Sequence, residues 1–302
     1  MPIRVVVLGT SCSNPTVERN LTAVALQFEG STLLFDCPEG TQRQMMKSGV
    51  SYMRVGAIFL SHWHADHVLG LPGLIATMSM HGRDAPLYVI GPRGTEKEIR
   101  KVLNIAMFRK SFEIIVKEVG RGIAFKGEKF TVSAVPLKHD IPCIGYVFKE
   151  NDKVAEFQRQ KALQLEIPEG PLWSKLQQGK SVEVNGKTFK PEQVLDYSKG
   201  KKGKKISIIM DTLPSDSYFD AIMESDLLVH EASFLDKHIS RAKETKHSTA
   251  KQAAWVAEQT KAKKLVLLHI SPRYKKNEDV ENEARMEFAN VVVAKDLMEI
   301  EV

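Results

Sequence analysis

The segment SHWHADHVLG, residues 61–70, concentrates side chains that can bind a metal ion. Three histidines and one aspartate lie within six positions: His62, His64, Asp66 and His67. An apolar run precedes them and a helical pattern follows, so we expect a strand-to-helix loop, on which side chains two positions apart can converge. Imidazoles and carboxylates are ligands that zinc prefers. A structural histidine is the ordinary alternative for one such residue, but four together favour a metal site.

Further ligands are expected at the ends of other strands, because one loop cannot complete two metal sites. His139, Asp211 and His269 each end an apolar run, where a polar side chain is costly unless it is paired or ligating. The resulting seven ligands suit two metal ions. The expected sets are His62, His64 and His139 for one ion, and Asp66, His67 and His269 for the other, with Asp211 as the bridge. Such a bridge holds two ions about 3.5–4 Å apart.

The elements that must position these residues are visible as apolar runs rich in β-branched residues. The predicted strands are 3–9, 22–28, 32–37, 57–62, 86–91, 130–135, 144–148, 206–211, 227–232 and 265–270. The second and third are predicted to pair as a hairpin across a short Glu-Gly-Ser turn. Helical patterns cover 39–49, 71–82, 94–107 and 249–262. This order predicts two β-rich sheets with helices on the outside.

Residues 151–205 interrupt this alternation of strands and helices. The segment holds 12 Lys and Arg against 7 Asp and Glu, a net +5 in a chain whose net charge is +6. Its Pro-Glu-Gly-Pro sequence, 168–171, forbids a continuous helix. A solvated or disordered linker is one interpretation. Apolar residues around Trp173 favour a folded, projecting arm whose lysines attract phosphate.

The bulk composition sets further limits. The chain has 302 residues, of which 43% are hydrophobic, enough for a sizeable core. No apolar run approaches the roughly 18 residues of a membrane span, and no signal peptide is apparent at the N-terminus. The three cysteines lie far apart. They are expected to be reduced core thiols, which is typical of a cytoplasmic protein.

The metal-binding motifs carry a resemblance to a known family. His-x-His-x-Asp-His with a later His, Asp and His resembles the metallo-β-lactamase superfamily. Other motifs are similar to ribonuclease Z, the family of tRNA 3′-processing endonucleases: NPTVERN (14–20), DCPEGTQRQ (36–44), GLPGL (70–74), VPLKHDIPCIGY (135–146), IPEGPLWSKL (167–176), MDT (210–212), HEASF (230–234), HSTAKQAA (247–254) and HISPRY (269–274). The chain departs from the family pattern at Val17, Pro38, Trp63, Ala65 and Met210, without loss of a ligand.

This resemblance implies an α/β fold, a four-layer αββα sandwich of the metallo-β-lactamase type. One catalytic domain would span residues 1–302, with 151–205 inserted as a basic, tRNA-binding arm. The implied activity is a zinc-dependent removal of the 3′ trailer from precursor tRNA, which leaves a 3′-hydroxyl on the tRNA and a 5′-phosphate on the trailer. Two Zn²⁺ per subunit are expected, with Mn²⁺ or Fe²⁺ as alternative occupants of similar ligands. The resemblance also implies a homodimer in which each arm serves the tRNA of the other subunit.

The resemblance also suggests roles for individual residues. Asp66 is expected to bind metal and to act as the general base toward the attacking water. Glu231 is expected to orient and charge His247, which then donates a proton to the leaving oxygen. Asp36 is expected to hydrogen-bond a metal-bound histidine.

Substrate contacts are predicted near the last ligand and in the segment 14–20. Ser271 and Arg273 follow His269 closely and are expected to hold a phosphate, although a salt bridge is the alternative for Arg273. Arg19 and Asn20 are expected to touch the acceptor end of the RNA.

Two other functions remain compatible with the sequence. A small-molecule phosphodiesterase or another hydrolase of the same fold would keep the seven ligands without needing the basic arm. A non-catalytic RNA-binding module would use the metals structurally, and such sites are usually closed by protein ligands.

Overall fold

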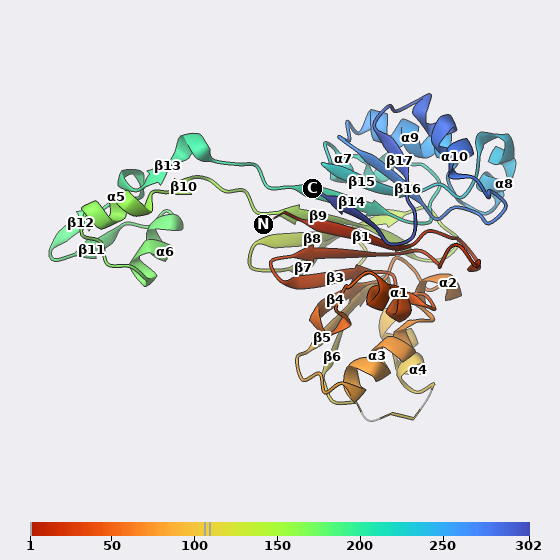
Figure 1. Ribbon diagram of the computed structural model, residues 1–302, viewed down its shortest axis with the longest axis horizontal. Helices are drawn as coiled ribbons and strands as arrows, with labels where there is room; N and C mark the ends of the chain where they lie inside the picture. The colour runs from red at the N-terminus through yellow and green to blue at the C-terminus, as the bar shows by residue number, and fades with distance from the viewer. Residues whose placement is uncertain (1, 106, 109) are drawn as a thin grey trace. The chain divides into compact units, whose positions relative to one another are not determined.

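Figure 1 shows a computed structural model of the chain, which describes residues 2–105, 107–108 and 110–302. The chain forms two compact units. One, here called the body, comprises Met1–Phe148 and Lys205–Val302, and the other, here called the arm, comprises Lys149–Lys204. The insertion expected from the sequence, 151–205, begins two residues later and ends one residue later than the arm.

The first sheet of the body has the strand order β18-β1-β2-β3-β4-β5-β6. Its strands are β1 (Arg4–Gly9), β2 (Ala23–Phe28), β3 (Ser31–Phe35), β4 (Val55–Phe59), β5 (Leu87–Gly91), β6 (Ile114–Glu118) and β18 (Met298–Glu301). Strand β1 is antiparallel to both its neighbours, and β2 and β3 form the predicted hairpin. From β3 to β6 the strands are parallel, so the ends of β3, β4 and β5 lie at one edge.

The second sheet has the order β17-β16-β15-β14-β9-β8-β7. Its strands are β7 (Gly122–Lys126), β8 (Phe130–Leu137), β9 (Cys143–Glu150), β14 (Lys205–Ile209), β15 (Leu227–Glu231), β16 (Leu265–Leu268) and β17 (Val291–Val293). Strands β14 to β17 are parallel. The arm is inserted in the sequence between β9 and β14, which are adjacent strands in this sheet.

All ten predicted strands are present, and four further strands of the body were not predicted. These four are β6, β7, β17 and β18, and each is the outermost strand of its sheet among the described residues. An outer strand has only one neighbour and is less covered, as the half-buried and exposed residues of β6 illustrate. β6, β7 and β18 therefore lack the continuous apolar run that marks an inner strand of a parallel sheet. β17 is a largely buried run of valines, but it is shorter than the roughly four to eight residues from which a strand is predicted.

The four predicted helices of the body are also present: α1 (Thr41–Lys47), α3 (Leu71–Met80), α4 (Thr95–Leu103) and α9 (Ala250–Gln259). Helix α4 ends earlier than predicted, and Ala106 of that prediction lies outside the described residues. The sequence did not predict α2 (Ala65–Val68), α7 (Phe219–Ile222), α8 (Ile239–Glu244) and α10 (Asn277–Arg285). Three short 3₁₀ turns lie at Tyr52–Arg54, Asp216–Tyr218 and Asp236–His238.

Three apolar clusters define the layers of the body. Because strand residues alternate between faces, Val5 and Val7 of β1 enter the cluster between the two sheets, whereas Val6 and Leu8 enter the cluster beneath α1, α3 and α4. The third cluster lies between the second sheet and α7, α9 and α10. Figure 1 shows these helices on the outer faces of the two sheets. The predicted four-layer αββα arrangement is therefore confirmed.

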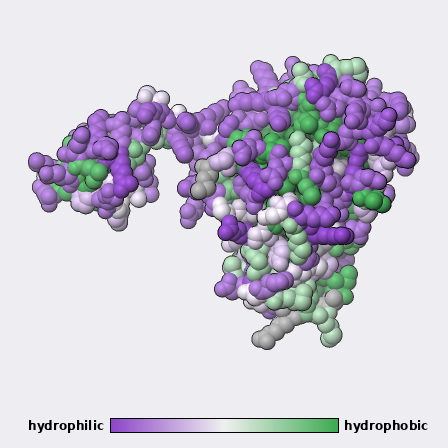
Figure 2. All heavy atoms as spheres, viewed as in Figure 1, coloured by the Kyte–Doolittle hydropathy of each residue, from purple (hydrophilic) through white to green (hydrophobic). Residues whose placement is uncertain are grey.

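The arm has a small apolar cluster of its own, built around Ala162, Ile167, Leu176, Val182 and Val194. Its elements are β10 (Glu156–Phe157), α5 (Arg159–Gln164), α6 (Pro171–Gln177), β11 (Val182–Val184), β12 (Lys187–Phe189), β13 (Leu195–Asp196) and two 3₁₀ turns, Pro191–Gln193 and Tyr197–Lys199. The 168–171 sequence separates α5 from α6, as predicted, because Pro171 opens α6. Hydrophilic residues cover most of the arm's visible face in Figure 2.

Two smaller expectations concern the cysteines and membrane spans. Cys12, Cys37 and Cys143 are all free and buried, as predicted. Among the helices of the described residues, none has the length and apolar character needed to span a bilayer.

Candidate metal centre

The seven predicted ligands meet at one edge of the body, in the segments that follow the ends of four strands. His62 and His64 follow β4, and Asp66 and His67 lie in the short helix α2. The second sheet contributes His139 after β8, Asp211 after β14 and His269 after β16. The second sheet thus brings three residues, spread over 130 positions from His139 to His269, to the segment 62–67.

The first group of ligand atoms comes from three histidines. His62 Nε2 lies 3.0 Å from His64 Nδ1, which in turn lies 3.2 Å from His139 Nε2. Two nitrogens bound at 2.0–2.1 Å to one tetrahedral zinc ion would be about 3.3 Å apart. The spacing therefore fits three ligands of a single ion.

The second group combines two histidines with a carboxylate. His67 Nε2 and His269 Nε2 lie 3.8 and 4.0 Å from Asp66 Oδ2. The group can hold a second ion, with slightly wider spacing than the first.

Asp211 lies between the two groups, and its two oxygens face different ones. Oδ1 is 3.2 Å from His269 Nε2 and 3.5 Å from His67 Nε2. Oδ2 is 3.7 Å from His62 Nε2 and 4.0 Å from His139 Nε2. This geometry is suited to a carboxylate that bridges two cations.

Three of these atoms fit a metal ion better than any other partner. His67 Nε2, His269 Nε2 and Asp211 Oδ1 are buried, and none has a hydrogen-bond partner among the described residues. A buried polar atom without a partner is costly, and protein interiors rarely contain one. Divalent cations would satisfy all three, so the residues fit the metal site that the sequence predicts.

Hydrogen bonds at the opposite ring nitrogen orient four of the five ligand histidines. The pairs are His62 Nδ1 with Ser61 Oγ at 2.9 Å, His67 Nδ1 with Asp36 Oδ2 at 2.8 Å, His139 Nδ1 with the Lys246 carbonyl at 3.2 Å, and His269 Nδ1 with Ser233 Oγ at 2.9 Å. Each bond leaves Nε2 directed at the ligand groups. The predicted contact of Asp36 with a ligand histidine is confirmed. Ser61 and Ser233 were not predicted.

Burial and charge set the protonation of the ligands. Burial lowers the pKa of three of them: His62, His64 and His269. They are therefore neutral, which is the form that binds a metal. Burial has the same tendency at His67, but the carboxylates of Asp211 and Asp36 outweigh it and hold its pKa well above the usual range. A cation that binds there must displace a proton.

Glu231 and His247 form a hydrogen-bonded pair beside the ligand groups. Glu231 is fully buried and accepts His247 Nδ1–H at 3.0 Å. Its two oxygens also accept the backbone N–H groups of Thr212, Ser248 and Ser233, each at 3.0 Å, and the Ser233 hydroxyl at 2.8 Å. Five donors therefore stabilise the carboxylate charge.

His247 is less enclosed than its partner, with 14% of its side chain exposed. Burial tends to lower the pKa of His247, but the charges of Glu231 and Asp211 and the bond to Glu231 raise it to about 9. The ring is therefore a cation near neutral pH and can donate a proton.

The predicted phosphate-binding residues near His269 are in contact with each other. Arg273 Nε donates to Ser271 Oγ at 3.1 Å, and its guanidinium lies 5.0 Å from the centre of the Phe234 ring. The structure thus places Arg273 in a cation–π contact.

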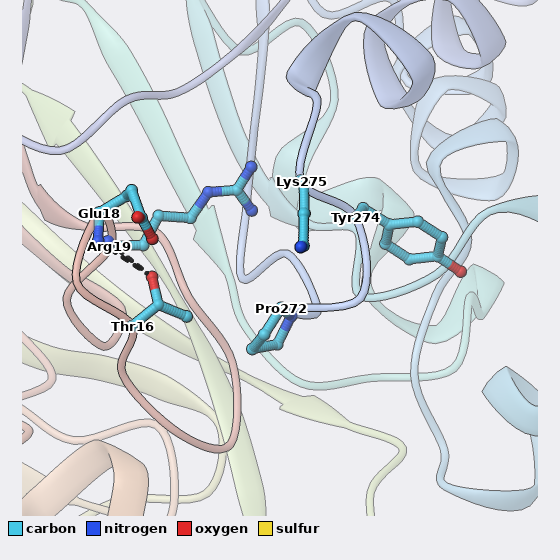
Figure 3. Close-up of a pocket in the computed structure, with 6 residues that line it drawn as sticks. All are labelled: Thr16, Glu18, Arg19, Pro272, Tyr274 and Lys275. Atoms are coloured by element: carbon cyan, nitrogen blue, oxygen red, sulfur yellow. Dashed lines mark hydrogen bonds between the residues drawn. The ribbon is translucent and has the colours of Figure 1, made fainter.

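The other two predicted contacts, Arg19 and Asn20, occupy different environments. Arg19 lines a cavity of about 400 Å³ with Thr16, Glu18, Pro272, Tyr274 and Lys275, and Figure 3 shows Arg19 and Lys275 on opposite sides of it. The Nη1 atom of Arg19 is buried without a hydrogen-bond partner in the part of the chain described. Asn20 instead donates its side-chain amide to the Glu39 carbonyl at 3.1 Å, which ties together two loops.

The loop that carries Arg19 also touches the metal ligands. The backbone N–H of Ser13 donates to Asp66 Oδ2 at 2.9 Å. The other wall of the cavity, Pro272 to Lys275, follows ligand His269 within six residues. Both walls of the cavity therefore belong to segments that contain or contact a metal ligand.

Two helix-covered sheets with paired His and Asp ligand groups at their strand ends define a metal-dependent hydrolase of the metallo-β-lactamase fold. Comparison with known proteins narrows this class. Ribonuclease Z of Methanosarcina acetivorans is 43% identical over 99% of this chain and 98% of its own length. Ribonuclease Z of Methanosarcina mazei is 43% identical over the same shares of the two chains. The chain belongs to the ribonuclease Z family.

A solved structure agrees with the fold. The crystal structure of human tRNase Z, short form, superposes with a TM-score of 0.72 and 29% identity, and the match covers 98% of each chain. Residues 3–151 also match the family model described as Anti-Pycsar protein Apyc1.

Proposed function

We propose that this protein is a two-zinc endoribonuclease that removes the 3′ trailer from precursor tRNA, leaving a 3′-hydroxyl on the tRNA and a 5′-phosphate on the trailer. Family membership supports the substrate, since the similar human structure is a tRNase Z. The chemistry is inferred from the geometry of Asp211. Its two carboxylate oxygens face two separate groups of three ligands.

The ligand groups would hold one ion each. The first ion would lie among His62, His64 and His139, and the second among Asp66, His67 and His269, with Asp211 shared. Two divalent cations there would lower the pKa of a water molecule and withdraw charge from the phosphoryl oxygen. Mn²⁺ or Fe²⁺ could use the same nitrogen and oxygen ligands.

Asp66 is proposed as the general base. Its side chain is 18% exposed, against 0% for His67 and 4% for Asp211, so it is the more accessible carboxylate to incoming water. The bond from Ser13 N–H to Oδ2 fixes its orientation. A carboxylate held in this position can accept a proton from the attacking water.

His247 is proposed as the general acid for the leaving 3′-oxygen. Its Nδ1–H is held by Glu231, and the raised pKa keeps the ring protonated at neutral pH. An alkoxide is a poor leaving group, so proton donation from the ring lowers the barrier to cleavage.

Ser271, Arg273, Arg19 and Asn20 are proposed to hold the RNA beside the centre. Arg273 keeps N–H donors for a phosphate because only Nε is engaged by Ser271. Arg19 and Lys275 place two cations at one cavity, where an RNA phosphate would be attracted. Asn20 would act by positioning this loop.

We also propose that the arm, within one metallo-β-lactamase-fold catalytic domain spanning 1–302, binds the tRNA and that the enzyme acts as a homodimer in the cytoplasm. The net +5 of residues 151–205 supports RNA binding, and free cysteines are usual in a reducing compartment. Sedimentation of the purified protein across a concentration series would reveal the dimer, and a monomer at all concentrations would contradict it.

Mapping the cut on a precursor tRNA, with metal analysis of the same sample, tests the main proposal. We expect one cut at the 3′ end of the tRNA body, a 3′-hydroxyl and about two zinc ions per chain, as two-metal sites require. Asp66→Ala is the control, and full cleavage by that variant would point to structural metals in an RNA-binding module. Turnover of small phosphodiesters without tRNA cleavage would instead indicate a small-molecule hydrolase.

A further inference from the structure

Two buried serines make matching contacts on the two sheets, and neither is a metal ligand. Ser61 Oγ donates to Asp36 Oδ2 at 2.8 Å and lies 2.9 Å from His62 Nδ1. The same hydroxyl is 3.5 Å from the second histidine bound to that carboxylate, His67. These contacts form a chain from His62 through Ser61 and Asp36 to His67.

Ser233 repeats this arrangement around a different carboxylate. Its Oγ donates to Glu231 Oε2 at 2.8 Å and lies 2.9 Å from His269 Nδ1. It is 3.4 Å from His247, the second histidine on that carboxylate. The order is therefore again histidine, serine, carboxylate, histidine.

The direction of each hydrogen bond follows from the number of hydrogens. A serine hydroxyl has one hydrogen to donate and two lone pairs. Because Nε2 of His62 and of His269 faces the metal groups, Nδ1 carries the hydrogen and the serine must accept it. The hydroxyl hydrogen of Ser61 then goes to Asp36 Oδ2, and that of Ser233 is shared between Glu231 Oε2 at 2.8 Å and the His269 carbonyl at 3.0 Å. Each serine therefore fixes its ligand histidine and its carboxylate together.

The two chains of contacts differ in where they end. The first ends at His67, whose side chain is 0% exposed and whose Nε2 faces the second ligand group. It therefore joins the two metal groups. The second ends at His247, which is 14% exposed and is the proposed proton donor.

We propose that Ser61 and Ser233 are positioning residues with different tasks. Ser61 couples the ligands of the two ions to each other through Asp36. Ser233 couples ligand His269 to the proton donor His247 through Glu231. The positions of both imidazole rings, one in the second metal group and one at the proton donor, therefore depend on one hydroxyl. The part of this inference that concerns proton donation by His247 rests on the proposed function. The part that concerns metal binding does not.

The test compares Ser233→Ala with Ser61→Ala, which remove the same atom from equivalent positions. Each variant is assayed on precursor tRNA, whose leaving oxygen needs a proton, and on bis(p-nitrophenyl) phosphate, whose leaving group does not. Zinc affinity is measured separately by competition with a chromophoric chelator. Ser233→Thr is the conservative variant that keeps the hydroxyl.

For Ser233→Ala we expect a loss of about 10–100-fold on precursor tRNA, as for other groups that orient metal ligands, and a clearly smaller loss on the phenyl ester. One of two zinc ions should bind more weakly, and excess zinc should not restore tRNA cleavage. For Ser61→Ala we expect both ions to bind more weakly, equal losses on the two substrates, and recovery with added zinc. Ser233→Thr should retain the wild-type ratio between substrates.

Equal losses on the two substrates for Ser233→Ala, or recovery with zinc, would overturn the link to His247. Unchanged zinc affinity in both alanine variants would overturn the coupling to the metal groups. Failure of the wild-type protein to cut precursor tRNA would refute the proposed function instead, and the zinc titrations would still decide the metal-binding half.

Discussion

At the scale of single residues, the chemistry depends on which ring nitrogen of each histidine faces the metal groups. His62, His67, His139 and His269 present Nε2, whereas His64 presents Nδ1. Hydrogen bonds at Nδ1 orient the rings of the first four histidines. Ser61 and Ser233 are two of the partners in these bonds. A serine beside a ligand has no sequence pattern of its own, because its role depends on carboxylates and histidines that the fold brings near.

The ligands themselves could be predicted because four cluster in the segment 62–67 and the other three each end an apolar run. Asp211 and His269 follow β14 and β16, in which every residue except Lys205 is buried, so a polar side chain there is costly unless it has a partner. The prediction could not extend to geometry. That Asp211 turns one oxygen toward each group, for example, depends on how two sheets pack.

Glu231→Gln should shift the pH dependence of tRNA cleavage. Glu231 and Asp211 together raise the pKa of His247 to about 9, against the effect of burial, and removal of one charge should lower it. His247 must be protonated to donate, and it loses its proton as pH rises through its pKa. The alkaline fall in kcat should therefore move to lower pH in the variant.

The measurement is kcat on precursor tRNA over about pH 6–10, a range that spans the ordinary and raised histidine values. Bis(p-nitrophenyl) phosphate is the control substrate, since its leaving group needs no proton and its profile should lack this fall. An alkaline limb at the same pH in both proteins would argue against His247 as the acid.

At the scale of elements, strand position decides what the sequence can predict. Inner strands such as β16, and β1 from Val5 onward, are buried on both faces and appear as apolar runs. The outer strands β6, β7 and β18 are less covered, and β17 has only three residues, so all four were missed. Helix α10 was missed for a related reason, because only Val280 and Ala284 of its nine residues are buried.

Helix α9 begins directly after the proposed acid, and its start is well defined. Thr249 Oγ1 accepts Gln252 N–H at 3.2 Å, and the Gln252 side chain accepts Thr249 N–H at 3.0 Å. This capping box supplies partners for N–H groups that the helix cannot satisfy. It also anchors the chain two residues beyond His247.

Thr249→Ala should lower the free energy of unfolding by about 1 kcal/mol, the usual effect of losing such a cap. Urea unfolding followed by circular dichroism measures the change. Glu258→Ala, at an exposed position of the same helix, is the matched control and should be nearly neutral. A Thr249 variant as stable as the control would show that the cap is dispensable.

At the scale of the whole molecule, the chain combines a catalytic body with a separately packed arm. The arm holds its own apolar cluster, and its two ends join neighbouring strands, β9 and β14. The sequence predicted the inserted segment from its charge and its break in rhythm. It did not predict the arm's strands, which are two or three residues long and carry too little pattern.

Deletion of about residues 155–200, with a short glycine linker, should separate RNA binding from chemistry. We expect loss of precursor tRNA cleavage by at least about tenfold, because phosphate contacts are removed. Hydrolysis of bis(p-nitrophenyl) phosphate should be retained, since all seven ligands lie in the body. Equal loss on both substrates would refute this division of labour.

Added salt should weaken tRNA binding by the intact protein. Each phosphate neutralised by a lysine or arginine releases counterions, so the logarithm of the binding constant should fall linearly with the logarithm of salt concentration. Fluorescence anisotropy with labelled tRNA measures the slope, and the arm-deleted protein should give a shallower one. A flat response from the intact protein would contradict phosphate-based recognition.

The entry and exit of the arm at adjacent strands have a consequence for how such proteins diversify. Because the segment leaves and rejoins the sheet at one place, a single genetic insertion or excision can add or remove it without rearranging the remaining topology. An ancestral hydrolase could thus have acquired the proposed RNA-binding arm in one event. The same junction offers protein engineers a site at which one binding segment can be exchanged for another.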